Sequence, residues 1–303
     1  MVEAVATVVE KSSWLASLEL QLEYNATGTR LSRSRHNGPL YVQKPFYPEG
    51  RDHPHIYLLH PPGGIVSGDS LTIIINAKKN TGVLVTTPGA ARIYRARDRQ
   101  TLHSQQHQQV QLNIGKNAVL EWFPLETIVF NGADVAMKTT IDLDEGSRFV
   151  GWEITCFGLP ARDEPFISGR FKQHYQVNQA GLPLFVDRLV LDDNHQKLLS
   201  GKAGMQELPV SGFFLIGPVI DEVSQRDAAG LDGSESVLVI LREQVQRLDV
   251  AECAAISKVG EFYVGRYLGD STEQARKIFT EWWRILRPRV IGREACPPRI
   301  WAT

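Results

Sequence analysis

The chain has few cysteines, almost no net charge and no long apolar run, and each absence excludes a class of protein. Its three cysteines, Cys156, Cys253 and Cys296, are spread over 303 residues. They predict neither a disulfide framework nor a C-x-x-C metal site, and this usage is typical of a reducing cytosol. A net charge of −1 lacks the basic excess of a general nucleic-acid binder. No segment approaches the roughly twenty uninterrupted apolar residues that cross a membrane.

The N-terminal segment MVEAVATVVEKSSW lacks the basic region and the long apolar core of a secretory signal. We therefore predict a cytoplasmic protein that binds neither a membrane nor nucleic acid. Hydrophobic residues make up 43% of the chain, which is enough for a substantial core. We expect a flexible leader over residues 1–12. Since no segment has the composition of a linker, we expect a single β-rich domain over residues 13–303.

Most of the first two thirds of the chain has the period of β-strands. From Ala16 to Tyr24, apolar residues alternate with polar ones, which is the pattern of a strand with one buried face. This spacing of strands predicts a mainly β fold, a layered β-helix-like or sandwich body of many short strands. Further strands are expected at Ile56–Leu59, Leu71–Ile75, Val83–Thr87, Val110–Ile114, Ala118–Trp122, Thr127–Phe130, Lys138–Leu143, Phe149–Phe157, Asp187–Asp193 and Val237–Leu241.

A few α-helices are expected near the C-terminus. Ser271 and Gln274 have the spacing of a capping box, an apolar stripe follows at helical spacing, and Pro288 is expected to end this helix. A weaker helix is expected over Val250–Lys258, and an exposed loop over Val219–Ser236. Trp282 and Trp283 are adjacent and cannot share one helix face, so one of them, taken as Trp283, is expected to reach a partner surface.

Two related turns carry the most distinctive residues of the sequence. His60–Asp69 reads HPPGGIVSGD, and Thr86–Arg95 reads TTPGAARIYR. Each Pro-Gly pair follows a strand-forming run and predicts a tight turn. Neither turn has the glycine spacing of a phosphate loop, and neither contains the G-x-S-x-G of a serine hydrolase.

Several acidic residues lie among apolar neighbours and need partners. An isolated buried charge is too costly, so each must be hydrogen-bonded, paired with arginine, hydrated or bound to a metal. Structural pairing and a place beside a water-filled passage are the two interpretations for this set, which comprises Asp69, Glu121, Glu126, Glu153 and Asp187.

The two turns, together with LEWFPLETIVFNGA over residues 120–133, GWE over 151–153 and PPRIW over 297–301, resemble the UreD family of urease accessory proteins, called UreH in some species. The resemblance runs from about Trp14 to the C-terminus. Two departures occur. Ser67 stands where another glycine is frequent, and Phe123-Pro124-Leu125 replaces the commoner Leu-Pro-Gln. Both departures weaken inferences about the fine geometry at the two positions concerned.

The resemblance implies a non-catalytic chaperone for the maturation of urease, a nickel enzyme. It implies that the protein binds apo-urease and the helical accessory protein UreF, which engages the GTPase UreG. No tightly bound cofactor is expected, only transient Ni(II) in an internal, solvent-filled passage. The family fold, a β-rich helix-like body with a few helices, agrees with the strand pattern.

The resemblance also assigns residues to motifs. His60 and Asp69 belong to the first motif, Glu121, Glu126 and Asn131 to the third, and Arg299 and Trp301 to the closing one. The second contains Thr86, Thr87, Arg92, Tyr94 and Arg95. With the passage in mind, the hypothetical nickel-path residues are His60, Asp69, Glu121, Glu126, Glu153 and Asp187.

Other interpretations remain open from the residues. His53 and His55 could meet one ion, because residues two apart in a strand share a face, although Pro54 interrupts that strand. His60 could instead hydrogen-bond the backbone of its turn. The alternatives for the whole protein are a β-helical carbohydrate-active enzyme that uses two carboxylates and a stand-alone nickel-binding protein.

Overall fold

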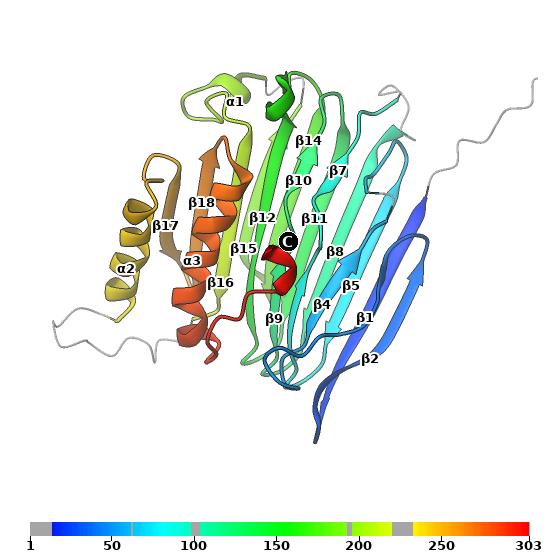
Figure 1. The fold of residues 1–303 in the computed structure, drawn as a ribbon, viewed down its shortest axis with the longest axis vertical. Coiled ribbons are helices and arrows are strands. Elements are labelled where there is room, and N and C mark those ends of the chain that lie inside the picture. Colours follow the sequence, from blue (N-terminus) through cyan, green and yellow to red (C-terminus); the bar gives the residue numbers. More distant parts are fainter. Residues whose placement is uncertain (1–13, 62, 98–103, 193–195, 220–232, 303) are drawn as a thin grey trace, which may run out of the picture.

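The computed structural model describes residues 14–61, 63–97, 104–192, 196–219 and 233–302. Two large sheets lie face to face, and helices cover one outer face (Figure 1). The seven-stranded sheet has the order β15 (Leu182–Leu191), β14 (Arg170–Gln179), β11 (Asp134–Leu143), β8 (Gln106–Ile114), β5 (Ser70–Ala77), β1 (Leu15–Asn25) and β2 (Gly28–Asn37).

The second sheet has eleven strands. Its main path runs through β17 (Ala254–Val259), β18 (Phe262–Gly269), β16 (Val210–Gly217), β12 (Arg148–Leu159), β9 (Val119–Phe123), β6 (Gly82–Thr86), β4 (His55–Leu59) and β3 (Tyr41–Val42). Three short strands lie off this path, namely β7 (Ala91–Ile93), β10 (Thr127–Val129) and β13 (Glu164–Pro165).

The chain passes back and forth between the sheets, and the central strands of each sheet are parallel, whereas the strands toward the edges pair antiparallel. In the seven-stranded sheet β1, β5, β8, β11 and β14 pair in parallel, and in the second sheet β4, β6, β9 and β12 do the same. Such parallel stacking makes each coil of the chain resemble a turn of a β-helix. The predicted mainly β, layered and β-helix-like fold is therefore confirmed.

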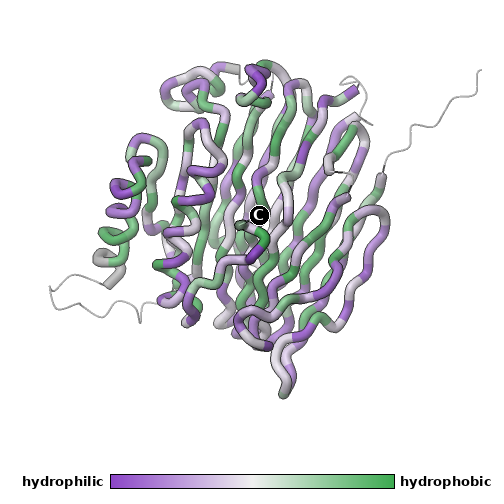
Figure 2. The backbone as a smooth tube through the Cα atoms, viewed as in Figure 1, coloured by the Kyte–Doolittle hydropathy of each residue, from purple (hydrophilic) through white to green (hydrophobic). Residues whose placement is uncertain are grey.

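Period-two patterning places one side of each strand in the core between the sheets. In β1 the side chains of Ala16, Leu18, Leu20 and Leu22 are buried, as the alternation predicted. Hydrophobic and hydrophilic residues alternate along the strands in Figure 2. A second apolar cluster fills the space between the eleven-stranded sheet and the helices α2 (Gly233–Arg247) and α3 (Thr272–Val290).

The predicted C-terminal helix is α3. Ser271 is its N-cap, and its hydroxyl accepts a hydrogen bond from the backbone N–H of Gln274 at 3.2 Å. The expected stop at Pro288 is wrong, because the helix continues to Val290. Proline removes one N–H donor, but the following turn still closes through Ile291 N–H to the Arg287 carbonyl at 2.8 Å.

Other expectations about elements are corrected. Val237–Leu241 is part of α2, because Val237, Leu241 and Val245 recur every four residues and pack on the sheet. The expected helix over Val250–Lys258 is replaced at Ala254 by β17, a strand that pairs with β18. The expected exposed loop at Val219–Ser236 lies outside the described residues over 220–232; Val219 is buried, and the segment 233–236 is wrong as a loop because it begins α2. The leader at 1–12 also lies outside the described residues.

Both adjacent tryptophans are buried, so the prediction that one of them reaches a partner surface is wrong. Trp282 and Trp283 are each 0% exposed. The indole N–H of Trp282 donates to the Leu241 carbonyl at 3.1 Å, and that of Trp283 donates to Glu121 at 2.6 Å. The two rings contact different parts of the interior, α2 for Trp282 and β9 for Trp283, so both can be buried although they do not share one helix face.

The long strands β2, β14, β16 and β18 were not foreseen, and they complete the sheets on either side of the predicted strands. The short strands β3, β7 and β13 and the short helix α1 (Gln196–Ser200) were not foreseen either. None of the described helices is long and apolar enough to cross a membrane.

Candidate functional site

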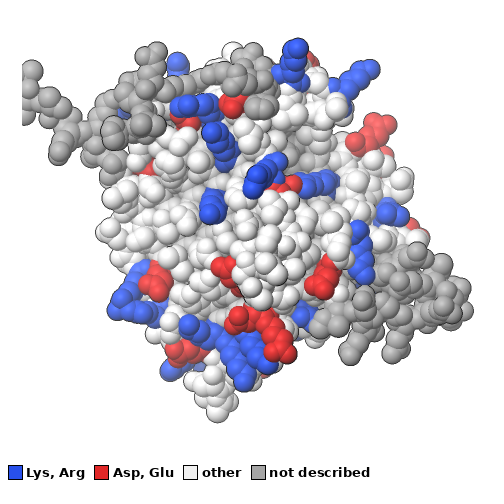
Figure 3. Space-filling view, turned by 180° about the vertical axis from the view of Figure 1, so that it is seen from behind, with Lys and Arg blue, Asp and Glu red and all other residues white. Residues whose placement is uncertain are grey.

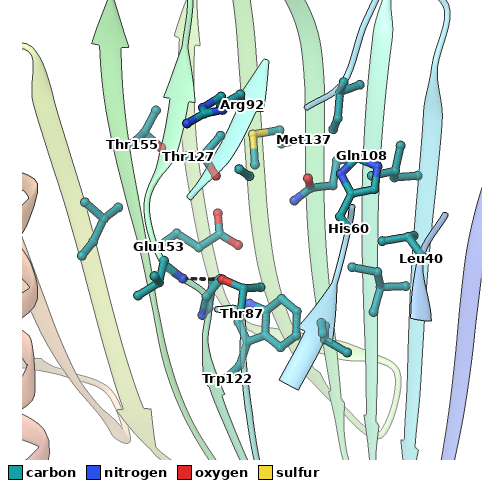
Figure 4. Close-up of a pocket in the computed structure, with 18 of the residues that line it drawn as sticks. Leu40, His60, Thr87, Arg92, Gln108, Trp122, Thr127, Met137, Glu153 and Thr155 are labelled. Carbon is teal, nitrogen blue, oxygen red and sulfur yellow. Dashed lines mark hydrogen bonds between the residues drawn. The ribbon is translucent and has the colours of Figure 1, made fainter. Parts of the chain in front are cut away.

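A cavity of about 80 Å³ lies between the two sheets, beside the ends of β4, β6 and β9. Its lining combines apolar residues of both sheets with a few polar groups (Figure 4). The polar lining residues are His60, Thr87, Arg92, Gln108, Thr127, Glu153 and Thr155. Three of the motif residues singled out in the sequence, His60, Thr87 and Arg92, therefore converge on the cavity together with Glu153.

Glu153 projects from β12 into the cavity (Figure 4). Its carboxylate accepts a hydrogen bond from the Thr139 hydroxyl at 2.6 Å and another from the Gln173 amide. Burial raises the pKa of Glu153 to about 6, against the lowering effect of these two hydrogen bonds. No described basic side chain forms an ion pair with Glu153. Of the two interpretations, pairing with a cation and a place beside a water-filled space, the second is therefore the one that fits this residue.

His60 lies across the cavity from Glu153 (Figure 4). Its Nε2 atom is buried and has no hydrogen-bond partner among the described residues. Burial lowers the pKa of His60, partly opposed by Asp69, so the imidazole is neutral near pH 7. The backbone bond of the turn is made by the His60 carbonyl, which accepts from Gly63 N–H at 2.9 Å. The imidazole is thus left free to face the cavity.

The first two turn motifs pack directly against each other. Ile65 N–H donates to the Arg92 carbonyl at 2.8 Å, and Tyr94 N–H donates to the Ile65 carbonyl at 3.0 Å. A Cβ atom on Gly64 would lie 2.2 Å from Cε2 of the Tyr94 ring, so only glycine permits this approach. The glycine of one motif and the tyrosine of the other therefore form one contact.

Two polar motif residues hold backbone instead of lining the cavity. Asp69 is 3% exposed and accepts from the N–H groups of Trp14 and Val66 at 3.0 and 2.9 Å. Asn131 accepts from the N–H groups of Ile167 and Ser168 at 3.1 and 2.9 Å. Both residues hold backbone N–H groups and neither lines the cavity, which supports a structural role for both.

The closing motif folds back onto the second and third motifs. The Thr86 hydroxyl donates to the Phe123 carbonyl at 2.5 Å and accepts from the Trp301 indole N–H at 3.0 Å. The Trp301 ring packs against the rings of Phe123, Trp152 and Trp283. Thr87, next along the chain, accepts from Leu125 N–H at 2.9 Å at the rim of the cavity.

Glu121 belongs to a separate buried ionic cluster. Its carboxylate is 0% exposed, bonds to His53 Nε2 at 2.7 Å and accepts from the guanidinium of Arg287 at 2.7 to 3.1 Å. These partners hold the pKa of Glu121 at about 2 although burial alone would raise it. The interpretation of Glu121 as a structurally paired carboxylate is supported, with arginine as the partner.

The same arginine binds a second carboxylate, which the sequence did not indicate. Arg287 donates to both oxygens of Glu49 at 2.7 and 2.8 Å, and Glu49 in turn bonds to His55 Nε2 at 2.8 Å. Arg287 is 0% exposed, and its pKa is raised by the two carboxylates despite the opposing effect of burial. Nothing local to Glu49 or Arg287 signals this contact, because they are distant in sequence.

The cluster has the residue types of a metal site but already contains a cation. Ligand atoms of Glu49, His53 and Glu121 lie within 4.8 Å of one another, as do those of Glu49, His55 and Cys296. The guanidinium of Arg287 donates to both carboxylates and neutralises them. His53 and His55 bond to different carboxylates of this cluster, Glu121 and Glu49, and the positive charge between the two carboxylates is an arginine.

The remaining predicted residues lie outside the cavity lining. Asp187 forms a two-pronged ion pair with Arg266 at 2.5 and 3.0 Å. Glu126 is half-buried, and Arg95 and Arg299 are exposed. Sequence reasoning missed the neutral polar groups around Glu153, namely Gln108, Thr127, Thr139, Thr155 and Gln173, since alternation along a strand does not show which inward positions face a cavity.

Comparison with known proteins gives one consistent result. A family model described as "UreD urease accessory protein" matches residues 15–302. A urease accessory protein UreD of Marinomonas sp. is 45% identical over 97% of this chain and 92% of its own length. Those of Psychromonas ingrahamii and Hahella chejuensis are 39% and 36% identical, each over 98% of this chain and over 96% and 93% of their own lengths.

Proposed function

Because the chain belongs to the UreD family of urease accessory proteins and so has a role in urease maturation, we propose that it is a cytoplasmic, non-catalytic scaffold that carries nickel toward apo-urease. In this proposal it binds apo-urease and UreF, and UreG joins through UreF. The cavity between the sheets is part of a solvent-filled passage for Ni(II), which is cargo and not a resident cofactor.

The observation that carries the nickel proposal is the pair of groups facing the cavity. Glu153 has no basic partner among the described residues, and His60 has a buried Nε2 without a described hydrogen-bond partner. A carboxylate oxygen and a neutral imidazole nitrogen are ligands that suit Ni(II). Two such ligands bind more weakly than a closed site, so an ion can leave again, as a transport route requires.

The alternative functions receive less support from the same cavity. A volume of about 80 Å³ holds a few water molecules, whereas pockets for small organic ligands are about 300 Å³ or larger. Of the described lining residues only Glu153 is a carboxylate, and glycosidases generally need two. A nickel store would need more ligands around the ion than the two that face each other here.

We predict that Glu153→Gln slows the nickel loading of urease without weakening the complex with its partners. Loss of one charged contact costs at least about 1.5 kcal/mol, so loading should slow by about tenfold. The measurement is nickel per urease by atomic absorption after reconstitution with the accessory proteins. Because the pKa of Glu153 is about 6, wild-type loading should also fall as the pH drops below that value.

The matched control is Glu126→Gln, which removes a motif carboxylate that does not line the cavity. His60→Ala should act in the same direction as Glu153→Gln. Full nickel loading at the wild-type rate in both cavity variants, with the complex intact, would refute the role of the cavity in the nickel route.

A further inference from the structure

The outer face of the seven-stranded sheet carries basic side chains in two adjacent cross-strand rows. In one row Arg188 of β15 pairs with His174 of β14, which pairs with Lys138 of β11. In the next row Lys172 of β14 pairs with Ala136, which pairs with His107 of β8. We call these five side chains the basic rows: His107, Lys138, Lys172, His174 and Arg188.

No acidic residue stands in either row over the strands from β15 to β5. Beyond the basic residues, the rows contain Val190, Ala136, Gln109, Ser70 and Thr72. Figure 3 shows several blue Lys and Arg groups across the middle of this face, with a red group among them, and red and blue atoms gathered at its lower end. Lys138, Lys172 and Arg188 are exposed and form no ion pair with any described residue.

Across the described strands, the charged side chains of the rows have basic neighbours and no acidic ones. Arg188 and Lys138 flank His174 across neighbouring strands, and burial together with these two charges lowers the pKa of His174. The buried Nε2 of His174 also lacks a hydrogen-bond partner among the described residues. By contrast, Arg170, the first residue of β14, is paired with Asp134. Packing within the protein therefore does not account for the basic rows.

We propose that the basic rows are a docking surface for an acidic segment of a partner protein. Strands lie about 4.8 Å apart and alternate residues about 7 Å apart, so Lys138, Lys172 and Arg188 form a flat array of positive charge. An extended segment with carboxylates at alternate positions matches this array. Val186, 44% exposed and two residues from Arg188 on the edge strand β15, adds an apolar contact at its border.

A protein fits this surface better than nucleic acid. The whole chain has a net charge of −1, and a nucleic acid would also meet the acidic residues at the lower end of this face. An acidic protein segment needs only the local patch. The proposal rests on the proposed function for the identity of the natural partner, which would be apo-urease or another accessory protein.

The test compares the wild type with the triple variant Lys138→Glu, Lys172→Glu, Arg188→Glu. The control is Lys78→Glu, Lys79→Glu, Lys202→Glu, which makes the same charge change at exposed positions outside the rows. The probe is a fluorescein-labelled oligoglutamate peptide, followed by anisotropy at low and near-physiological salt. We expect salt-sensitive binding that the triple variant weakens by at least about tenfold and the control changes little.

Equal binding by the wild type and the triple variant would overturn the proposal. So would tighter binding of a single-stranded DNA oligonucleotide of equal charge than of the peptide. A second arm measures co-elution with apo-urease and the accessory proteins, and the triple variant should reduce it. If the wild type binds oligoglutamate through the rows but does not bind these proteins, the proposed function fails while the docking surface stands.

Discussion

At the scale of single residues, two glutamates of similar sequence context have opposite environments. Glu121 and Glu153 each lie in a strand beside a tryptophan. Glu121 meets a guanidinium and an imidazole, and its pKa falls to about 2. Glu153 meets only neutral donors beside a cavity, and its pKa rises to about 6. The partners, and not the residue type, separate a structural carboxylate from a candidate cation ligand.

Glu121→Gln should destabilise the protein strongly. The folded-state pKa of Glu121 lies below its ordinary value of 4.5, so its stabilisation is present above pH 4.5 and is lost as the pH falls toward about 2. A shift of this size corresponds to about 3 kcal/mol at neutral pH. Urea unfolding at neutral pH and near pH 3 should show a difference between variant and wild type that shrinks in acid.

The control for this change is Glu145→Gln, which removes an exposed ion pair with Lys116 and should change the free energy of unfolding little, because solvent screens the pair. A loss of stability at Glu121 no larger than at Glu145 would show that the buried cluster contributes little.

How far the sequence predicts such sites depends on the range of the contacts. The apolar neighbours of Glu121 show that its carboxylate needs a partner. The partner is Arg287, 166 residues away, and only the packing of α3 on the eleven-stranded sheet reveals it. The cavity could likewise be found only in the structure. The motifs already contained His60, Thr87 and Arg92, but no local sequence pattern shows that separate turns lie side by side.

At the scale of elements, the strands were the most predictable part. Alternating residues specified β1 closely, because one of its faces lies in the core between the sheets. Runs rich in Val, Ile, Thr and aromatic residues located β5 and β12 and the second half of β8. The misassigned segments were Val237–Leu241 and Val250–Lys258. Both are short apolar stretches in which strand and helix periods are hard to distinguish, and tertiary packing decides between them.

The contact between the two turn motifs gives a prediction at this scale. Gly64→Ala should cost about 1 to 3 kcal/mol, because the new methyl group collides with the Tyr94 ring that holds the second turn. Gly89→Ala is the matched control, since no atom lies within 4 Å of a Cβ at that position. Thermal unfolding of both variants measures the difference. Equal melting temperatures would contradict the proposed packing of the motifs.

At the scale of the whole molecule, the architecture separates several roles. The space between the sheets contains the cavity, and the space between the eleven-stranded sheet and the helices contains the second apolar cluster. The buried ionic cluster joins β9, α3 and the segment before β4. The outer face of the seven-stranded sheet is free of covering helices in the described part of the chain and presents the basic rows. A scaffold with an internal route and an external docking face is consistent with this division.

The scaffold function is tested by size-exclusion chromatography with light scattering of this protein mixed with UreF and apo-urease from the same organism. We expect one peak whose mass and composition include all three proteins. A folded, monodisperse protein that elutes apart from both would contradict the scaffold function.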